Sequence, residues 1–209
     1  MSMTVAIQLL GGLGTRLSSI TEGKIPKPLV KINNKSLVEL QILECIRYGI
    51  KDFVWVTYHL PDQFVEEKSR LISLYGHSID SISIYQEKYP LSTFGSIYSS
   101  SQLFKSDTYL VLYGDLTFSL DLFRLLSDFH SHSSDIHVVS RYSDHPHDSD
   151  KVVIEDDNVI SKFISKKEPP SVSHPATTTS GIYVCSRQFL DKLKHWSGQK
   201  CDLFSEVLV

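Results

Sequence analysis

The chain has 209 residues, of which 41% are hydrophobic and 22% are charged, and its formal net charge is −3. This usage is typical of one globular domain with a substantial core. The weakly acidic balance argues against nucleic acid or a membrane surface as a partner, and no apolar run approaches the roughly 20 residues of a membrane span. Cys45, Cys185 and Cys201 lack metal-ligand spacing, so we expect reduced core thiols and a cytoplasmic location.

The first part of the chain alternates between strand-like and helix-like patterns. An apolar run that ends at glycines opens the chain and is typical of a buried parallel strand. Runs of β-branched and aromatic residues recur after it, separated by segments with helical spacing. The expected strands are residues 4–10, 53–58, 82–85, 109–113 and 136–140, and the expected helices are residues 36–49, 61–75, 94–104 and 120–130. This alternation predicts an α/β fold with a doubly wound, mostly parallel sheet.

From about residue 144 the pattern changes. Two short strands, residues 151–155 and 159–164, flank a turn and predict a β-hairpin. A polar connection over residues 166–175 precedes an expected strand at residues 180–184 and expected helices at residues 187–196 and 202–208. The chain ends inside an apolar helical pattern, so we expect that it was cut from a longer protein.

Glycines and two cations follow the first strand. The chain reads Gly11-Gly12-Leu13-Gly14-Thr15-Arg16-Leu17 and, a little later, Pro26-Lys27-Pro28-Leu29. Glycines allow a tight turn and let backbone N–H groups approach an anion, while Arg16 and Lys27 add positive charge. The dinucleotide fingerprint is excluded because its last glycine is missing, and the P-loop because no Gly-Lys-Ser/Thr occurs. The segment predicts a polyphosphate-binding loop, with an ordinary strand-to-helix turn as the alternative.

Asp115 is the candidate metal ligand. It follows Gly114 directly after the expected strand at residues 109–113. Open α/β sheets bind ligands at the carboxyl ends of their strands, and a carboxylate there can hold Mg²⁺, which bridges phosphates. An aspartate that only shapes a turn is the alternative.

These motifs resemble those of the nucleotidyltransferases that join a sugar 1-phosphate to a nucleoside triphosphate and release pyrophosphate. The resemblance covers nearly the whole chain and is closest over the first thirty residues and at Gly114-Asp115. It implies a single Rossmann-like, GT-A-like nucleotidyltransferase domain over residues 1–209. Residues 1–143 would form its nucleotide-binding core, and residues 144–209 would form the sugar-binding part with the small β-hairpin.

The resemblance also implies roles for individual residues in an in-line displacement. Arg16 is expected on the β and γ phosphates, Lys27 on the α-phosphate and the incoming phosphate, and Asp115 on Mg²⁺. Residues 90–95 resemble the family's Pro-Leu-Gly-Thr-x-Gly nucleotide loop, although Ser92 and Phe94 depart from it. Gln86 or Glu87 is expected at the base edge, with two solvated loop residues as the alternative. The expected nucleotide-binding residues are Leu10, Gly11, Gly12, Gly14, Thr15, Gln86, Glu87, Ser92, Thr93 and Gly95.

The sugar-phosphate side matches the family less closely. The resemblance places Gly114, Thr179, Gly181 and either Lys166 or Lys167 there. The family typically shows Phe-x-Glu-Lys-Pro and Asn-Ala-Gly-Ile-Tyr, whereas this chain has serine for the glutamate, a second lysine for the proline and threonine for the asparagine. A solvated pair of lysines is the alternative. The family's second metal-binding aspartate, in an Asp-x-Gly-Thr segment, has no counterpart before the end of the sequence.

The run His145-Pro146-His147-Asp148-Ser149-Asp150 points to a narrower group. Its spacing matches no zinc site, so we expect a loop. It resembles D-glycero-D-manno-heptose 1-phosphate guanylyltransferase domains, some of which are fused to a phosphatase of the haloacid dehalogenase type. That resemblance implies GTP, manno-heptose 1-phosphate and GDP-manno-heptose.

Other substrates and another class stay open. Hexose 1-phosphates, or N-acetylmuramate 1-phosphate with UTP, are the alternative substrates. A fused C-terminal domain and a homo-oligomer also fit the resemblance. A nucleotide-sensing domain without turnover is the rival class, and the presence of Arg16, Lys27 and Asp115 argues against it.

Overall fold

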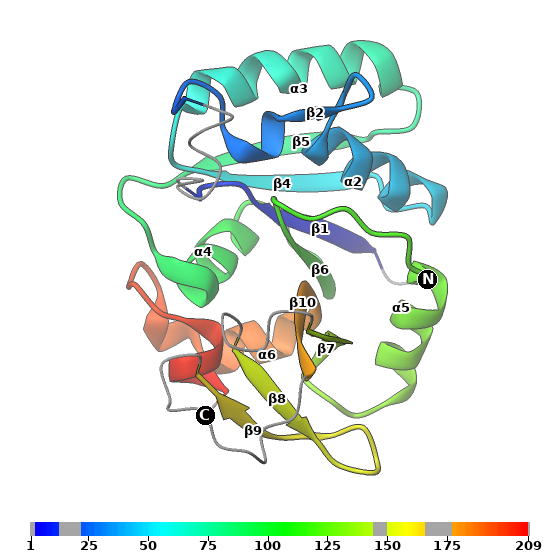
Figure 1. Ribbon diagram of the computed structural model, residues 1–209, viewed down its shortest axis with the longest axis vertical. Helices are drawn as coiled ribbons and strands as arrows, with labels where there is room; N and C mark the ends of the chain where they lie inside the picture. The colour runs from blue at the N-terminus through cyan, green and yellow to red at the C-terminus, as the bar shows by residue number, and fades with distance from the viewer. Residues whose placement is uncertain (1–2, 13–21, 144–149, 166–176, 209) are drawn as a thin grey trace.

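One mixed sheet with helices on both faces forms the centre of the computed structural model, which describes residues 3–12, 22–143, 150–165 and 177–208 (Figure 1). Its strands follow the order β5-β4-β1-β6-β10-β8-β9, and β7 pairs with β10 beside that path. Their bounds are β1 Thr4–Leu9, β4 Asp52–Thr57, β5 Ser81–Gln86, β6 Thr108–Tyr113, β7 Ile136–Tyr142, β8 Lys151–Ile154, β9 Ile160–Ile164 and β10 Thr177–Ser186. The predicted α/β class and doubly wound sheet are confirmed.

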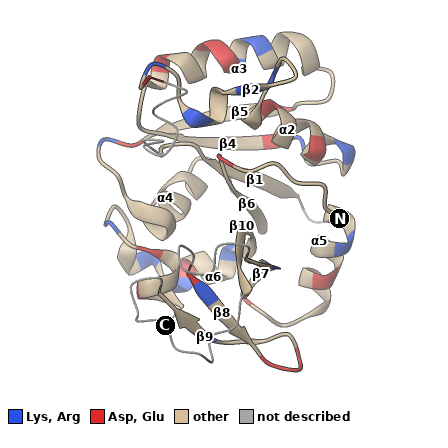
Figure 2. Cartoon of the chain, viewed as in Figure 1, with Lys and Arg blue, Asp and Glu red and all other residues tan. Residues whose placement is uncertain are grey.

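Strands β5, β4, β1 and β6 form the parallel half of the sheet. β1 lies at its centre, where Ile7 pairs with Val54 of β4 and with Val111 of β6. β1 and β6 contain no charged residue, and both are tan along their length in Figure 2. This composition is expected of parallel strands that are covered on both faces.

The other half of the sheet is antiparallel and centres on β10. This strand runs antiparallel to β6, β7 and β8, and β8 pairs with β9 as the predicted hairpin. The register between β10 and β7 shifts between Thr179 and Tyr183, and Gly181 inside this irregularity has a φ of +81°. Glycine adopts that left-handed conformation at little cost, so the bulge needs Gly181. β10 is longer than the strand predicted over residues 180–184.

Helices cover both faces of the sheet. α2, α3 and α5 pack on one face, in an apolar cluster that includes Ala6, Phe64 and Phe129. α4 and α6 pack on the other, in a cluster that includes Ile7 and Ile97. The alternation of Ala6 and Ile7 between the two clusters follows from the period of two along a strand. The helices are α2 Leu37–Arg47, α3 Pro61–Tyr75, α4 Ser92–Ser101, α5 Leu122–Ser131 and α6 Arg187–Lys192.

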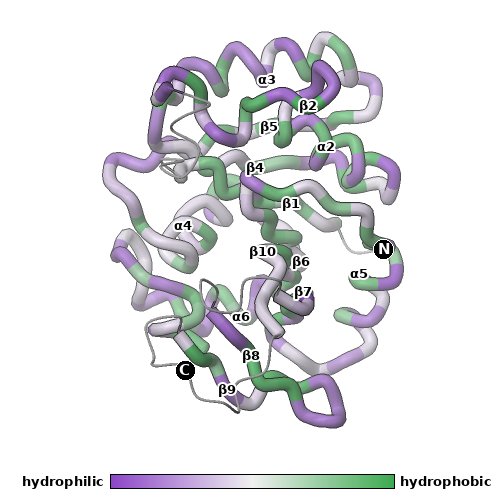
Figure 3. The backbone as a smooth tube through the Cα atoms, viewed as in Figure 1, coloured by the Kyte–Doolittle hydropathy of each residue, from purple (hydrophilic) through white to green (hydrophobic). Residues whose placement is uncertain are grey.

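The hydropathy of the chain agrees with these layers. In Figure 3 the central strands are mainly green, whereas α3 mixes purple and green along its length. Within α3, Phe64 and Leu71 lie seven residues apart and are buried, whereas Glu66 and Ser69 between them are exposed. Spacings of three, four and seven residues are what a helix with one buried face requires.

Side chains that precede the helices determine where two of them begin. Ser36 Oγ accepts a hydrogen bond from Glu39 N at 3.1 Å, and Asp121 Oδ1 accepts one from Arg124 N at 3.0 Å. Such caps satisfy N–H groups that have no partner within the helix, and each contributes about 1 kcal/mol. The cap at Asp121 explains why α5 begins at Leu122 and not at the predicted residue 120.

The C-terminal helices are shorter than predicted. The helix expected over residues 187–196 is α6 followed by the 3-10 turn η3, Lys194–Trp196, and the one expected over residues 202–208 is the π-helical turn η4, Leu203–Val207. Nor did the sequence predict the small hairpin of β2, Lys31–Ile32, and β3, Lys35–Ser36. Asn33 and Asn34 form its turn with φ of 50° and 65°, a conformation that asparagine tolerates better than most residues.

The segment before η4 covers the N-terminus of α4. Phe94 N and Gly95 N both donate to Cys201 O, at 2.9 and 3.1 Å, and Cys201 N donates to Leu91 O at 2.9 Å. The first N–H groups of a helix have no partner within the helix, so this carbonyl replaces a side-chain cap. The C-terminal part of the chain thus fixes the start of α4. The helix begins at Ser92, whereas the sequence predicts a start at residue 94 or 95.

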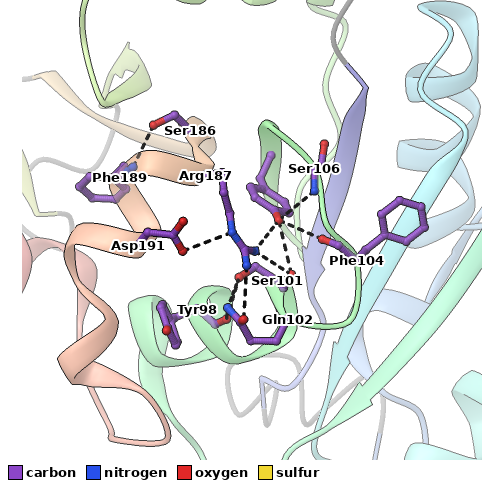
Figure 4. A network of polar contacts seen from close by, with 10 residues as sticks. Tyr98, Ser101, Gln102, Phe104, Ser106, Ser186, Arg187, Phe189 and Asp191 are labelled. Carbon is purple, nitrogen blue, oxygen red and sulfur yellow. Dashed lines mark hydrogen bonds and ion pairs between the residues drawn. The ribbon is translucent and has the colours of Figure 1, made fainter.

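The other end of α4 is held by Arg187, the first residue of α6 (Figure 4). Arg187 Nη1 donates to Tyr109 Oη at 2.9 Å and to Ser101 O at 3.3 Å. Its Nε lies 3.3 Å from Asp191 Oδ1. α4 is therefore tied to the C-terminal part of the chain at both ends.

The cysteines are buried and free, as predicted. Burial raises the pKa of the Cys185 thiol to about 12 and that of Cys201 to about 11, so both stay protonated near neutral pH.

Across the described ranges, no helix is both long and apolar enough to cross a membrane.

Gly95→Ala should destabilise the fold. A Cβ at this position would lie 2.4 Å from Gln199 O and 3.0 Å from Leu91 Cβ, so the backbone at residue 199 must move. The gain in helix propensity is about 1 kcal/mol, whereas such overpacking costs about 1–3 kcal/mol, so we expect a net loss of unfolding free energy. Urea denaturation measures it, with Gly12→Ala as the control because a Cβ there meets nothing within 4 Å. A Gly95→Ala protein as stable as wild type would contradict the packing described.

Candidate active site

A cavity of about 390 Å³ opens at the carboxyl ends of β1 and β6. The chain leaves β1 for β4 and β5 on one side and returns to β6 on the other, so the strand order reverses between β1 and β6. Open α/β sheets bind their ligands at such a reversal. The cavity is lined by Leu9, Gly11, Gly12, Lys27, Pro28, Val56, Glu87, Pro90, Ser92, Thr93, Ser96, Tyr113, Gly114 and Asp115.

The backbone after β1 forms one wall of the cavity. Leu10 N donates to Val56 O at 2.8 Å, and the Leu10 side chain is buried, so Leu10 supports the turn without lining the cavity. A Cβ on Gly11 would lie 3.3 Å from Tyr58 Cβ. Gly14, Thr15 and Arg16, which the sequence predicts to bind phosphates, lie outside the described residues.

An ion pair joins the predicted catalytic lysine to the predicted metal ligand. Lys27 begins the 3-10 turn η2, Lys27–Leu29, and its Nζ donates to Asp115 Oδ2 at 2.6 Å. The lysine side chain is 22% exposed and the aspartate side chain 41% exposed. Solvent screens a pair with this exposure, so it contributes little to stability. Both charges stay accessible to a ligand in the cavity.

Gly114 permits the close approach of the two loops that carry these charges. Gly114 N donates to Leu9 O at 3.0 Å. A Cβ here would lie 2.7 Å from Leu10 Cδ2, 2.8 Å from Leu9 O and 2.9 Å from Pro28 Cγ. These atoms belong to the end of β1 and to η2, so any side chain at residue 114 would push the Asp115 turn away from Lys27.

Glu87 lies in the cavity wall although it is only 7% exposed. Its backbone N–H donates to Thr57 O at 2.8 Å, and its Oε1 accepts from Ser96 Oγ at 2.5 Å. Burial raises the pKa of the Glu87 carboxyl, while hydrogen bonds from Ser96 and from the backbone of Leu91 oppose that shift. Gln86 is exposed and does not line the cavity, so only Glu87 of the two residues predicted at the base edge is a cavity residue.

Ser92 and Thr93, the first residues of α4, also line the cavity. Both hydroxyls donate to Asp202 Oδ2 at 3.4 Å, and Thr93 Oγ1 lies 3.2 Å from Tyr113 Oη. Burial alone would raise the pKa of Asp202, but hydrogen bonds led by those from the Ser205 amide and hydroxyl lower it overall. Ser92 has a φ of 62°, a left-handed conformation that glycine adopts more readily.

The residues predicted for the sugar phosphate are not all brought together. Gly114 lines the cavity, whereas Thr179 and Gly181 lie on β10 and do not. A Cβ on Gly181 would lie 3.1 Å from Tyr113 Cγ, so the lack of a side chain serves packing against the cavity wall. Likewise Gly95, predicted to bind the nucleotide, packs against residue 199 and does not line the cavity. Lys166, Lys167 and the run 144–149 lie outside the described residues.

Ser96, Tyr113 and Asp202 shape the cavity although the sequence did not single them out. Ser96 follows Thr93 by three helical positions and therefore shares its face of α4. Tyr113 ends β6 directly before Gly114. The helical spacing could have identified Ser96, and the position directly before Gly114 could have identified Tyr113. Asp202 accepts hydrogen bonds from residues that lie 109 and 110 positions earlier in the chain, and no local pattern predicts such contacts.

The Asp115 carboxylate suits a cation that shares its coordination with phosphates. Asp115 and Glu87 both line the cavity, and Asp115 is the more exposed. Across the described ranges, no group of three or more His, Cys, Asp or Glu residues could hold a metal ion. Mg²⁺ is usually held by one or two carboxylates together with substrate phosphates and waters. The donor set therefore fits Mg²⁺ bound with a nucleotide.

Comparison with known proteins assigns the chain to one family. Residues 5–207 match the family described as "Nucleotidyl transferase". The mannose-1-phosphate guanyltransferase of Saccharomyces cerevisiae is 29% identical over 191 residues, which are 89% of this chain and 51% of that protein. The mannose-1-phosphate guanylyltransferase catalytic subunit beta of Dictyostelium discoideum is 27% identical over 194 residues, 90% of this chain and 51% of that one. The chain thus spans about half the length of these curated relatives.

Solved structures share the fold. HddC from Yersinia pseudotuberculosis, complexed with GMP-PN, superposes with a TM-score of 0.75 at 22% identity over 100% of this chain and 85% of that one. The inositol-1-phosphate CTP transferase from T. maritima superposes with a TM-score of 0.76 at 20% identity, over 97% of this chain and 79% of that one. At these identities the likeness extends to the fold alone.

Gly114→Ala should separate the two loops of the site. The added methyl group would collide with the end of β1 and with Pro28, so we expect Asp115 to move out of ion-pair range of Lys27. Overpacking of this kind should also lower the unfolding free energy by about 1–3 kcal/mol. A crystal structure and a urea titration of the variant measure both effects. An intact ion pair at wild-type stability would show that the approach does not depend on glycine.

Proposed function

The chain belongs to the nucleotidyl transferase family, and we propose that it transfers a nucleoside monophosphate from a nucleoside triphosphate to a sugar 1-phosphate. The observation that carries the proposal is the Lys27–Asp115 pair, which places a cation and an accessible carboxylate in one cavity at the strand-order reversal. We also propose that residues 1–143 bind the nucleotide and residues 144–209 the sugar.

The proposed reaction is an in-line displacement. An oxygen of the sugar 1-phosphate attacks the α-phosphorus, the bond from that phosphorus to the bridging oxygen breaks, and pyrophosphate leaves with the electron pair. No protein group forms a covalent bond, so catalysis rests on positioning and on charge stabilisation. The Lys27 side chain is 22% exposed, so its Nζ can move from Asp115 to the phosphates, and the glycine backbone after β1 can donate N–H groups to them.

Asp115 would hold Mg²⁺ in this reaction. When bound, the ion would supply positive charge to the phosphate oxygens of both substrates. Lys27 would then exchange its carboxylate partner for phosphate oxygens, which keeps its charge compensated throughout.

Asp115→Asn should therefore leave the fold intact while weakening the dependence of turnover on Mg²⁺.

We propose GTP as the nucleotide because of Glu87. A carboxylate accepts two parallel hydrogen bonds, and the Watson–Crick edge of guanine presents two adjacent donors, N1–H and N2–H. Uracil and thymine present one N–H on that edge. The guanyltransferase names of the relatives and the guanine nucleotide in the HddC structure support the same choice.

The sugar proposed first is manno-heptose 1-phosphate, which gives GDP-manno-heptose. It rests on the resemblance of residues 145–150 to heptose guanylyltransferase domains. Mannose 1-phosphate is the second candidate, because the relatives from S. cerevisiae and D. discoideum carry that substrate in their names.

We also propose a cytoplasmic location, which the buried free cysteines support. The fused domain and the homo-oligomer stay predictions of the sequence.

The proposal is tested by pyrophosphate release in Mg²⁺. GTP, ATP, UTP and CTP are each combined with manno-heptose, mannose, glucose and N-acetylmuramate 1-phosphates, using this chain. We expect release with GTP and one manno-configured sugar 1-phosphate. Release with UTP and N-acetylmuramate 1-phosphate would overturn the substrate assignment. Nucleotide binding without release from any pair would favour the nucleotide-sensing class.

Glu87→Gln should relax the choice of nucleotide. The amide offers one acceptor and one donor in place of two acceptors, so the preference for GTP over the other triphosphates should fall about 10–100-fold in kcat/KM. Gln86→Ala is the matched control, because the neighbouring side chain is exposed and lies outside the cavity. A loss of GTP preference in Gln86→Ala with none in Glu87→Gln would show that Gln86, and not Glu87, selects the nucleotide.

A further inference from the structure

Three buried side chains form a hydrogen-bonded chain from the centre of the sheet to the Asp115 turn. Trp55 Nε1 donates to Gln8 Oε1 at 2.8 Å, and Gln8 Nε2 donates to Gln41 Oε1 at 2.7 Å. Gln41 Nε2 then donates to two backbone carbonyls, Tyr113 O and Leu116 O, each at 2.8 Å. Trp55 and Gln8 are fully buried and Gln41 is 1% exposed. None of the three lines the cavity.

The direction of every bond in this chain follows from its first member. An indole N–H can only donate, so it fixes the oxygen of Gln8 toward Trp55. The amide nitrogen of Gln8 must then face Gln41, and the oxygen of Gln41 must face Gln8. Both N–H groups of Gln41 are left for the two carbonyls. A buried amide is costly unless it is bonded, so alternative orientations are disfavoured.

The two carbonyls lie on either side of Gly114 and Asp115. Gln41 therefore holds both ends of the turn that presents the Asp115 carboxylate, while Gly114 N bonds to Leu9 O between them. Tyr113 and Leu116 are three residues apart in sequence, and one amide group spans them. With its ends fixed, the turn has little freedom to move Asp115 away from Lys27.

We propose that Gln41, oriented by Gln8 and Trp55, is a positioning residue for the reaction: it fixes the turn that holds Asp115 at the cavity. This proposal rests on the proposed function for its catalytic part. Gln41 does not touch the cavity, so it acts through the turn and not through a substrate. Displacement of a reacting group by about 1 Å can cost about 100-fold in rate, so small movements of this turn matter.

The test compares Gln41→Met with Ile42→Val. Methionine keeps the length of the side chain but donates no hydrogen bond, and Ile42 is the adjacent buried residue of α2, whose side chain has no group that can hydrogen-bond to the turn. In Gln41→Met we expect amide hydrogen exchange over residues 114–116 to accelerate about tenfold or more. We expect kcat to fall about 10–100-fold while KM for the nucleotide changes little. Ile42→Val should show neither effect.

A folded Gln41→Met protein with wild-type exchange and wild-type kcat would overturn the proposal, as would equal losses in Ile42→Val. If the wild-type protein releases no pyrophosphate with any substrate pair, the proposed function fails, and the exchange comparison still decides whether Gln41 holds the turn. If Gln41→Met does not fold, Gln8→Met serves instead. It removes the partner that orients the Gln41 amide, so exchange over the same residues should accelerate to a smaller extent, and unchanged exchange would overturn the proposal.

Discussion

The turn after β6 lies against the end of β1 and against η2, and the candidate site depends on that contact. Gly114 makes it possible, because a Cβ would come within 2.9 Å of atoms in Leu9, Leu10 and Pro28. The approach brings Lys27 and Asp115, 88 residues apart in the sequence, to 2.6 Å. The Gly11-Gly12 backbone, a cation and a carboxylate then share one cavity, which is the arrangement that the proposed transfer requires.

The ion pair does not hold this arrangement together. Its charges are partly exposed and contribute little to stability, whereas the groups that support them are buried and hydrogen-bonded. The Gln41 amide holds the turn on one side, and the carbonyl of Cys201 fixes the start of α4 beside the cavity. Stability thus resides in neutral hydrogen bonds around the site, which leaves the charged pair free to exchange partners. Such preorganisation lets charge be stabilised without moving the scaffold.

Local patterns predicted the parallel strands, Lys27 and Asp115, because apolar runs and the residues that end them are encoded within a few positions. Gly95 was predicted as a binding residue from the resemblance of residues 90–95 to a nucleotide loop, but in the structure its lack of a side chain allows packing against residue 199. Gln41 could not be predicted, because its partners are 33, 72 and 75 residues away and a glutamine on an apolar helix face carries no local signal. The C-terminal helices were overestimated, since capping and tertiary contacts, not periodicity, end them.

The central claim is that Lys27 and Asp115 act as one unit on the phosphates. A double-mutant cycle measures this directly, using kcat/KM for pyrophosphate release by wild type, Lys27→Ala, Asp115→Asn and the double variant. We expect each single variant to lose orders of magnitude in kcat/KM and the double variant to lose little more than the worse single one, because the effects of groups that act together are non-additive. Losses that simply multiply in the double variant would show instead that Lys27 and Asp115 act independently.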